Sequence, residues 1–211
     1  MPNLVPGTID RADWEVPAFE VAELRPKASH YAVVIPVINE GERLVSQLRQ
    51  MAALGQMNLS DVIIADGGSN DGSTSLDLLS SFGVRALLVK RGEGKLSAQL
   101  RMAYAWTLAC QGYDGVVTID GNGKDGVETL PDFLGALDRG FDYVQASRFI
   151  AGGKSINTPL VRWFAIRFIH SPILSVAAGT WLTDTTQGYR AYSARYLLHP
   201  DVQPFRSVFS R

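Results

Sequence analysis

Cysteine is almost absent from this sequence, since Cys110 is the single one among 211 residues. A lone cysteine excludes a disulfide within the chain and is compatible with a reducing compartment. The apolar residues Leu108 and Ala109 precede it. We therefore expect Cys110 to be a small buried side chain and not a nucleophile.

Long apolar runs are missing as well. The N-terminus lacks the basic and then apolar segments of a signal peptide. The most apolar window, 163–182, is interrupted by Arg167, His170 and Pro172. A spanning helix needs about 20 mostly apolar residues, because charges are costly inside a membrane. We therefore expect no membrane span, and a cytoplasmic protein.

Several familiar site motifs are absent. The turn at 92–97 is not a P-loop, because Val89 replaces its first glycine and Leu96 its Ser or Thr. No G-x-G-x-x-G follows the first predicted strand, which weakens dinucleotide binding. A calcium loop starting at Asp120 would need a glutamate where Pro131 stands. The three histidines have no metal-ligand spacing, and no serine elbow supports a Ser-His-Asp triad.

Charge is unevenly distributed, although the net charge is only −1. Residues 1–144 contain 12 Lys and Arg against 19 Asp and Glu, whereas residues 145–211 contain 8 against 2. An acidic half that binds metal, followed by a basic half, suits an anionic substrate with a cation between them. A solvated surface with uneven charge is the alternative. We expect no nucleic-acid partner.

Strand patterns alternate with helix patterns from residue 31 on. The predicted strands are 31–36, which proline stops, 62–65, 84–89, 116–119 and 143–147. One predicted helix opens at 39–42, with Asn39 as its N-cap, and runs to about 54; the others end near 82 or cover 97–109 and 130–137. Such alternation is typical of βαβ units, so we predict an α/β domain with a mostly parallel sheet flanked by helices.

The two ends of the chain look less regular. Residues 1–30 are predicted to form an irregular N-terminal arm without catalytic content, anchored by Trp14 and Phe19, so that the domain proper is 31–211. Residues 161–182 are expected to form two short helices broken at Pro172. Residues 191–198 then form a short strand or helix.

Acidic polar turns follow two of the predicted strands. Asp120-Gly121-Asn122-Gly123-Lys124-Asp125 follows strand 116–119, and Asp66 opens a similar turn that runs to Ser73. In open parallel sheets, ligands bind just beyond the carboxyl ends of the strands. Two carboxylates and an amide at that place suit a divalent cation, Mg²⁺ or Mn²⁺, and the phosphates that it bridges. An ordinary polar turn is the alternative.

Six segments follow one another in a specific order. They are 33–40 (V-V-I-P-V-I-N-E), 65–73 (A-D-G-G-S-N-D-G-S), 96–101 (L-S-A-Q-L-R), 120–122 (D-G-N), 147–153 (S-R-F-I-A-G-G) and 184–190 (D-T-T-Q-G-Y-R). Together they resemble the motifs of the family 2 nucleotide-sugar glycosyltransferases with the GT-A fold, especially the branch of dolichol-phosphate mannose synthase. Each motif alone is weak, whereas six in order are specific. The resemblance covers about residues 31–198.

The resemblance implies an inverting transferase that moves a sugar from a nucleotide-diphosphate sugar to an acceptor. It implies that Asp120 binds a divalent cation, with Asn122 beside it and Asp125 available as a further ligand. The nucleotide sugar would contact residues of the first strand ends and helices: Pro36, Asn39, Glu40, Asp66, Gly68, Ser69, Lys95, Arg101 and Asp120.

The resemblance also implies catalytic roles in the basic half. Arg148 and Arg162 would bind phosphate, for which the fixed fork of an arginine is suited. Asp184 would act as the base or contact the acceptor. Several of the implied site residues have a structural alternative. The two arginines could be solvated surface charges, Asp66 could cap its turn, and Lys95 and Arg101 could form a polar helix face.

Some residues depart from the family pattern. Asn122 replaces the second carboxylate of the metal motif, so a cation would be held more weakly or recruit Asp125. Lys124 stands near a metal-binding position and could supply positive charge directly. Gly67 replaces a second aspartate after Asp66. The family continues with another helix and strand beyond Arg211, so the C-terminal end is expected to be truncated.

The acceptor is inferred from chemistry and resemblance. A phosphate nucleophile is ionised near neutral pH and needs no base, whereas a sugar hydroxyl does. The resemblance favours a polyprenyl phosphate over a glycan hydroxyl, and a role in cell-envelope polysaccharide or glycolipid synthesis. Segment 163–182 would then fit a helix in the interface of the inner membrane face. The alternative, which we favour, is a packed pair of core helices. Homo-oligomerisation stays open.

Two other functions compete with the transferase. A sugar-1-phosphate nucleotidyltransferase has a related fold, but its G-x-G-T-R-L type of loop is missing after the first strand. A degenerate nucleotide-binding module fits the altered metal motif and the early end of the chain. Metal-dependent turnover of a nucleotide sugar would distinguish the transferase from that module.

Overall fold

The computed structural model describes residues 3–11, 13–150, 153 and 159–206, with Arg162 described by its backbone only. Contacts divide the chain into two compact units. The main unit comprises residues 1–144 and 191–211, and the second unit comprises residues 145–190. The predicted domain boundary at residue 30 stays a prediction.

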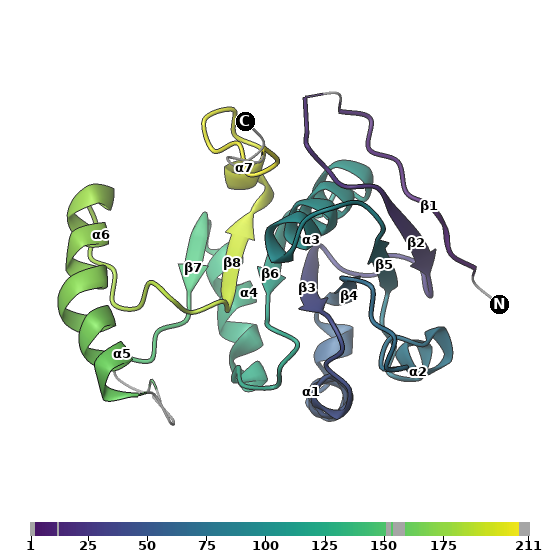
Figure 1. The fold of residues 1–211 in the computed structure, drawn as a ribbon, viewed down its shortest axis with the longest axis horizontal. Coiled ribbons are helices and arrows are strands. Elements are labelled where there is room, and N and C mark those ends of the chain that lie inside the picture. The colour runs from purple at the N-terminus through teal and green to yellow at the C-terminus, as the bar shows by residue number, and fades with distance from the viewer. Residues whose placement is uncertain (1–2, 12, 151–152, 154–158, 207–211) are drawn as a thin grey trace. The chain divides into compact units, whose positions relative to one another are not determined.

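The described strands form one sheet of eight strands in the order β1-β2-β5-β4-β3-β6-β8-β7 (Figure 1). Their bounds are β1 Val5–Pro6, β2 Phe19–Glu23, β3 Tyr31–Val37, β4 Asp61–Asp66, β5 Ala86–Lys90, β6 Gly115–Thr118, β7 Tyr143–Gln145 and β8 Arg190–Ser193. Strand β3 pairs in parallel with β4 and β6, and β4 with β5, whereas β2 pairs antiparallel with β1 and β5. The predicted α/β class with a mostly parallel sheet is confirmed.

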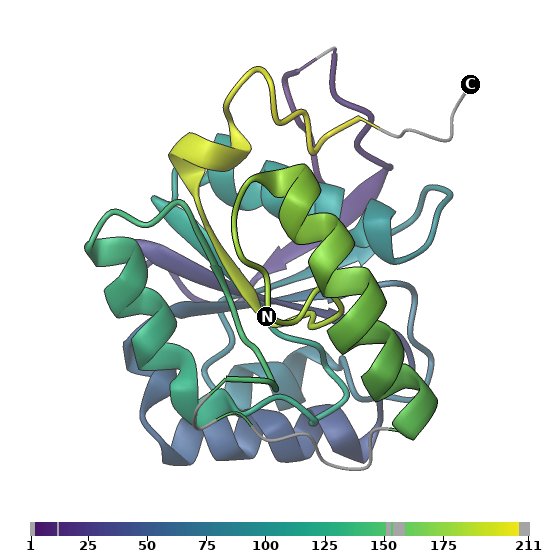
Figure 2. The same cartoon turned by 90° about the vertical axis from the view of Figure 1, so that its left-hand side faces the viewer.

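Within the main unit, helices cover both faces of this sheet. The α-helices are α1 Glu42–Ala53, α2 Leu76–Ser81, α3 Leu96–Tyr104, α4 Leu130–Asp138, α5 Leu160–Phe164, α6 Ser171–Ala178 and α7 Ala194–Leu197. Short 3₁₀ turns lie at Gln56–Asn58 and Val127–Thr129, and π-helical turns at Ala105–Cys110 and Ala165–His170. In the main unit α1 and α2 lie on one face and α3 on the other (Figures 1 and 2).

The alternation of strand side chains explains this layering. Successive residues of a strand point to opposite faces. Val34 and Ile63 pack in one cluster with Met102 and Trp106, from α3 and the π-turn after it. Their strand neighbours face α1, whose buried stripe at helical spacing is Leu44, Gln47, Leu48 and Met51. Both faces of the central strands are therefore buried, as parallel sheets require.

The N-terminal segment contributes to the sheet. Strand β2 pairs with β5 from Phe19, opposite Lys90, to Glu23, opposite Ala86. The prediction of an irregular arm is therefore wrong for these residues. The predicted anchors are confirmed, because Phe19 is buried and the Trp14 ring stacks on Phe205 with centroids 3.6 Å apart.

Strand β3 does not stop at Pro36, as was predicted, but continues to Val37. Proline lacks the N–H that a central strand normally donates. On one side β3 pairs with β4 up to Val37, whereas its pairing with β6 ends at Val34. The Pro36 carbonyl points toward Gly121, which follows β6. The missing N–H thus lies on the side where the ladder has already ended.

The amino end of β4 is closed by an internal ion pair. Asp61 is fully buried and lies 2.8 Å from the Arg25 guanidinium. The Tyr113 hydroxyl and the backbone N–H groups of Ala28 and Ser29 donate to the same carboxylate. A buried carboxylate needs such partners because burial alone disfavours its charge. This end of the sheet is structural, which leaves the carboxyl end for a ligand.

Two helices differ from their predicted form. Residues 160–178 are continuously helical, so the predicted break at Pro172 is wrong. The π-turn that precedes α6 places Pro172 in the first turn of a new helical segment, where no N–H is needed.

Cys110 ends the other π-turn and is exposed, so its predicted burial is also wrong. Partial burial of the thiol still raises the pKa of Cys110, which makes it a weak nucleophile at neutral pH.

Candidate active site

The turn after β4 is organised by the side chain of Asp66. Its Oδ1 accepts hydrogen bonds from the Gly68 N–H at 3.0 Å, the Ser69 N–H at 2.8 Å and the Ser69 hydroxyl at 2.7 Å. The Thr74 hydroxyl donates to the other oxygen at 3.3 Å. Asp66 therefore shapes the turn, as its structural alternative required. Its contact with a nucleoside stays a prediction.

Hydrogen bonds join this turn to the loop between β3 and α1. The Asn39 N–H donates to the Ser69 hydroxyl, and Asn39 Oδ1 accepts the Asn70 N–H, both at 2.9 Å. Asn39 adopts a left-handed φ of 52°. The prediction that Asn39 is the N-cap of α1 is wrong, because that helix begins at Glu42 after Gly41. Its side chain instead holds two predicted nucleotide-binding loops together.

Asp71 makes a second link between the same loops. Its Oδ2 accepts the Gly41 N–H at 2.8 Å, and its Oδ1 accepts the Ser73 hydroxyl and N–H. These bonds, the Ser73 hydroxyl first, lower the pKa of Asp71. Asp71 thus stays ionised at neutral pH and keeps the two loops in register.

The third turn, at 120–125, lies against β3 and α1. A Cβ on Gly121 would lie 2.6 Å from Val37 Cγ1, so only glycine allows this approach to β3. The Asp120 N–H donates to Asp125 Oδ2 at 3.1 Å, which brings two predicted metal ligands together. The Lys124 N–H donates to Asn122 Oδ1 at 3.0 Å. All three predicted metal ligands thus belong to one compact turn, which packs against the end of β3 and against α1.

Gln99 of helix α3 is a residue that motif matching alone did not single out. It is almost fully buried, and its Nε2 donates to the carbonyls of Val37 at 2.9 Å and Ala65 at 3.1 Å. A Cβ on Gly67 would lie 2.9 Å from that nitrogen. The Gln99 amide therefore fills the space beside Gly67, where the family pattern has an aspartate. A polar residue on the buried face of a predicted helix was the available signal.

The remaining predicted donor residues are less central. The Arg101 Nε donates to the Glu15 carbonyl at 2.9 Å, which ties this side chain to the N-terminal segment. Lys95 is exposed at the start of α3. Glu40 lies 2.9 Å from the Arg43 guanidinium, and Pro36 is buried in β3. Their contacts with a nucleotide stay predictions.

In the second unit, Arg148 and Asp184 form an enclosed ion pair. Arg148 Nε donates to Asp184 Oδ2 at 2.7 Å, and Arg148 Nη2 donates to Oδ1 at 3.0 Å. Asp184 also accepts the N–H of Thr186 at 3.1 Å, and its side chain is fully buried. A two-point pair of this kind fixes the orientation of a guanidinium.

This pairing determines the protonation of Asp184. Burial raises the pKa of Asp184, but hydrogen bonds from Arg148 and the Thr186 backbone outweigh burial and leave that pKa below its usual value. The carboxylate is therefore charged at neutral pH and a weak proton acceptor. The geometry favours support of Arg148 over general-base catalysis. Of the other predicted residues here, Gly152 and the Arg162 side chain lie outside the described residues.

Curated relatives decide the family of this chain. It is 33% identical over 177 residues to the undecaprenyl-phosphate mannosyltransferase of Micrococcus luteus, an alignment that covers 82% of this chain and 70% of the relative. The chain belongs to the family 2 nucleotide-sugar glycosyltransferases. It is also 30% identical over 197 residues to the polyprenol monophosphomannose synthase of Mycolicibacterium smegmatis, covering 92% of this chain and 71% of that one. No family model matches the chain.

Solved structures confirm the GT-A fold of this glycosyltransferase. The glucosyl-3-phosphoglycerate synthase of Mycobacterium tuberculosis, in complex with Mn²⁺, UDP and glucosyl-3-phosphoglycerate, superposes with a TM-score of 0.56 at 19% identity. The superposition covers 78% of this chain and 57% of that structure. In the described part of this glycosyltransferase, no helix has the length and apolar character needed to cross a membrane.

Proposed function

We propose that this glycosyltransferase moves a hexosyl group from a nucleotide-diphosphate sugar onto a polyprenyl phosphate at a membrane surface. The observation that carries the proposal is the placement of three polar turns at the carboxyl ends of β3, β4 and β6. Hydrogen bonds join the first two turns, and the third packs against the end of β3. Ligands of open parallel sheets bind at such an edge. The names of the two curated relatives support the acceptor, because both state a polyprenyl carrier.

A divalent cation fits the turn at 120–125. The side chains of Asp120, Asn122 and Asp125 offer only oxygen ligands, which Mg²⁺ and Mn²⁺ prefer. Among the described residues, no three His, Cys, Asp or Glu side chains are grouped for a metal. Two carboxylates suit Mg²⁺, which is commonly held by one or two carboxylates, water and substrate phosphates. When bound, such a cation supplies positive charge to the leaving diphosphate.

The chain's own residues would hold the rest of the donor. The loops that carry Asn39, Glu40, Asp66, Gly68 and Ser69 are already fixed to one another by hydrogen bonds. Fixed loops bind a nucleotide with little loss of conformational entropy. We assign the nucleoside to these loops, at the end of β3 where Pro36 lies. Lys95 and Arg101 are proposed phosphate contacts.

A phosphate acceptor agrees with the absence of a free base at Asp184. Because a phosphate monoester is ionised near neutral pH, no proton needs to be removed before attack. Arg148, held by Asp184, then serves as an oriented positive charge for a phosphate group. Arg162 is proposed for the same task from its place on α5.

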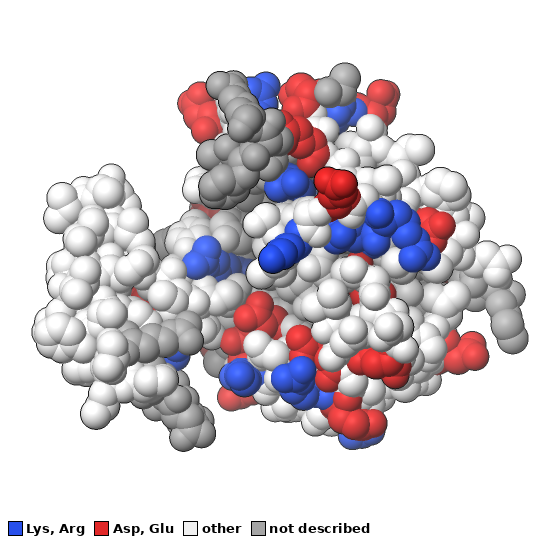
Figure 3. Space-filling model, in the orientation of Figure 1, with Lys and Arg blue, Asp and Glu red and all other residues white. Residues whose placement is uncertain are grey.

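Helices α5 and α6, with the π-turn between them, are proposed to lie on the membrane. Their apolar side chains are largely exposed: Leu160, Val161, Phe164, Phe168, Ile169, Ile173 and Val176. On the face seen in Figure 3, this helical segment is almost entirely uncharged. Residues 145–183 contain four Lys and Arg and no Asp or Glu. This composition fits anionic lipid headgroups around an apolar face. The exposure of the apolar side chains argues against the packed pair of core helices.

The exposed phenylalanines give a direct test of this placement. Replacing Phe164 and Phe168 by aspartate is expected to weaken binding to anionic phospholipid vesicles by about tenfold for each side chain, because their burial in lipid is lost and a repelled charge is added. Vesicle co-sedimentation measures the change. The same substitution at Leu54 and Leu59, exposed apolar residues of the main unit, is the control. Equal loss for both pairs, or none for either, would contradict the placement.

The proposed activity is tested by following the sugar into lipid. The protein is incubated with Mn²⁺, radiolabelled GDP- or UDP-hexoses and vesicles that contain undecaprenyl phosphate. We expect label in the organic extract with one nucleotide sugar, as an acid-labile lipid phosphodiester. Label that appears only as free sugar or water-soluble glycan would refute the acceptor. Nucleotide binding without any turnover would favour the degenerate module.

A further inference from the structure

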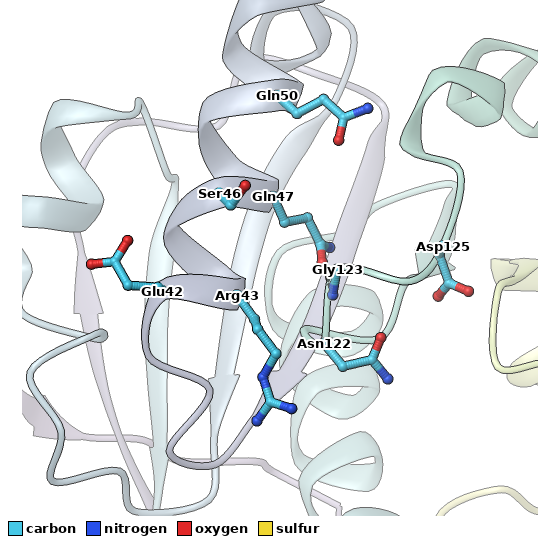
Figure 4. A pocket seen from close by; sticks show the side chains of 8 residues that line it. All are labelled: Glu42, Arg43, Ser46, Gln47, Gln50, Asn122, Gly123 and Asp125. Atoms are coloured by element: carbon cyan, nitrogen blue, oxygen red, sulfur yellow. Dashed lines mark hydrogen bonds between the residues drawn. The ribbon is translucent and has the colours of Figure 1, made fainter. Parts of the chain in front are cut away.

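A polar cavity of about 270 Å³ lies between helix α1 and the turn at 120–125 (Figure 4). Its walls come from two parts of the main unit: Glu42, Arg43, Ser46, Gln47 and Gln50 of α1, and Asn122, Gly123 and Asp125 of the turn. The cavity thus borders two of the three proposed metal ligands. The predicted nucleotide-binding residues outside the turn at 120–125 do not line this cavity.

Gln47 connects the two walls. Its side chain reaches from α1 toward Gly123 (Figure 4), and its Oε1 accepts the Gly123 N–H at 3.0 Å. Two other hydrogen bonds, from the N–H groups of Asp120 and Lys124, close within the turn itself. The Gln47 bond instead ties the turn to a helix that packs on the sheet.

The other end of the same amide has no partner. Gln47 is 3% exposed, and its Nε2 is buried without a hydrogen bond in the described structure. A buried donor that is left unpaired lowers the stability of the folded protein. Leu44, Leu48 and Met51 occupy the same buried face of α1, so an apolar residue at 47 would avoid this cost. The acceptor bond to Gly123 is the feature that an apolar residue could not supply.

Gly123 is the middle of the segment that carries the ligands. Its φ of 69° lies in the left-handed region, and it stands directly between Asn122 and Lys124, two residues before Asp125. Fixing this N–H therefore fixes the direction of the chain at Asn122 and Asp125. Groups that orient metal ligands affect affinity nearly as strongly as the ligands do.

We infer that Gln47 is a positioning residue for the cation-binding turn, acting through its hydrogen bond to Gly123. The inference rests on the proposed cation site at Asp120, Asn122 and Asp125. It assigns to Gln47 no contact with the cation. Its role requires an acceptor oxygen at this position and does not require the Nε2 donor.

Three variants of α1 separate this role from simple packing. Gln47→Met keeps the length but removes the acceptor, whereas Gln47→Glu keeps an acceptor oxygen and removes the unpaired donor. Gln50→Met is the matched control, because Gln50 lines the same cavity but is exposed and lies one turn further along α1, away from Gly123 (Figure 4). Thermal melting confirms that each variant is folded.

Two measurements are made on each protein. Mn²⁺ binding is followed by electron paramagnetic resonance with the metal alone, and amide hydrogen exchange of the peptide that contains 120–127 is followed without metal. For Gln47→Met we expect about tenfold weaker Mn²⁺ binding and faster exchange of that peptide, because the Gly123 N–H loses its acceptor. Gln47→Glu should retain both properties, and Gln50→Met should match the wild type.

The outcomes distinguish this inference from the function on which it rests. If Asp120→Asn abolishes Mn²⁺ binding while Gln47→Met leaves binding and exchange unchanged, the cation site stands and the role of Gln47 is refuted. If the wild type binds no Mn²⁺, the cation site and the inference fall together. Equal weakening in Gln47→Met, Gln47→Glu and Gln50→Met would refute the specific bond, because it would show a general effect of the cavity wall.

Discussion

Asp120→Asn is expected to lower hexose transfer about a thousandfold, because a bound cation commonly contributes several kcal/mol of charge stabilisation in the transition state. The substitution keeps the size of the side chain and removes the charge that would hold the cation. Asp120 lies two residues beyond the end of β6 and is only partly buried, so the fold should persist. Transfer to lipid, measured over a series of Mn²⁺ concentrations, gives the result.

The same strand offers a matched control for this prediction. Asp114 directly precedes β6 at its amino end, is exposed and pairs with His30 at 3.2 Å. Asp114→Asn removes one carboxylate from the opposite end of the strand and should leave transfer unchanged. Asp120→Asn with near wild-type activity, together with insensitivity to a chelator, would contradict the cation site. The positive charge of Lys124 would then be the candidate replacement.

Much of the main unit could be predicted because its signals are local. The runs 31–36, 62–65 and 116–119 are rich in β-branched residues and bounded by turn residues. Each lies within an observed strand or reaches just past its end. Strand β2 was missed because its evidence is not local. Phe19–Glu23 contains two glutamates among its five residues, and it becomes a strand by pairing with β5, far away in the sequence.

The site shows the same division between local and tertiary information. The turns at Asp66 and Asp120 were predicted, because turn residues and carboxylates are visible in the sequence. Gln47 and Gln99 were missed as functional residues, because what matters is the backbone group that each reaches after folding. Both occupy buried positions of a helical pattern, where a polar residue needs a partner. That mismatch is a signal that sequence reasoning can use.

Proline was over-interpreted at two places. Pro36 lies inside β3 because the pairing of β3 with β6 ends before it, at Val34. Pro172 follows a π-turn, after which the helical segment continues. Both outcomes depend on hydrogen bonds that the proline does not need to make. The rule that proline ends a strand or helix is correct about the missing N–H. It does not say whether the fold places a hydrogen-bond acceptor opposite that position.

Asp184→Asn is expected to destabilise the folded protein by about 3–5 kcal/mol, because it leaves the Arg148 charge enclosed without its partner. The Arg148 side chain is 19% exposed and Asp184 is fully buried, with Nε and Oδ2 2.7 Å apart. Urea unfolding at neutral pH measures the difference. The control is Glu20→Gln, which breaks the exposed pair with Arg91 and should cost less than about 1 kcal/mol. Equal effects of the two substitutions would contradict an enclosed pair.

Acid should reveal the same ion pair through the pKa of Asp184. Because that pKa is lower in the folded than in the unfolded protein, the contribution of Asp184 to stability is complete above the unfolded value of about 3.9 and is lost as the pH falls through the folded pKa. The difference in unfolding free energy between wild type and Asp184→Asn should therefore be constant near neutral pH and narrow from about pH 5 downward. A difference that stays constant down to strong acid would mean that Asp184 stabilises the unit by packing, and that Arg148 is oriented by something other than its charge.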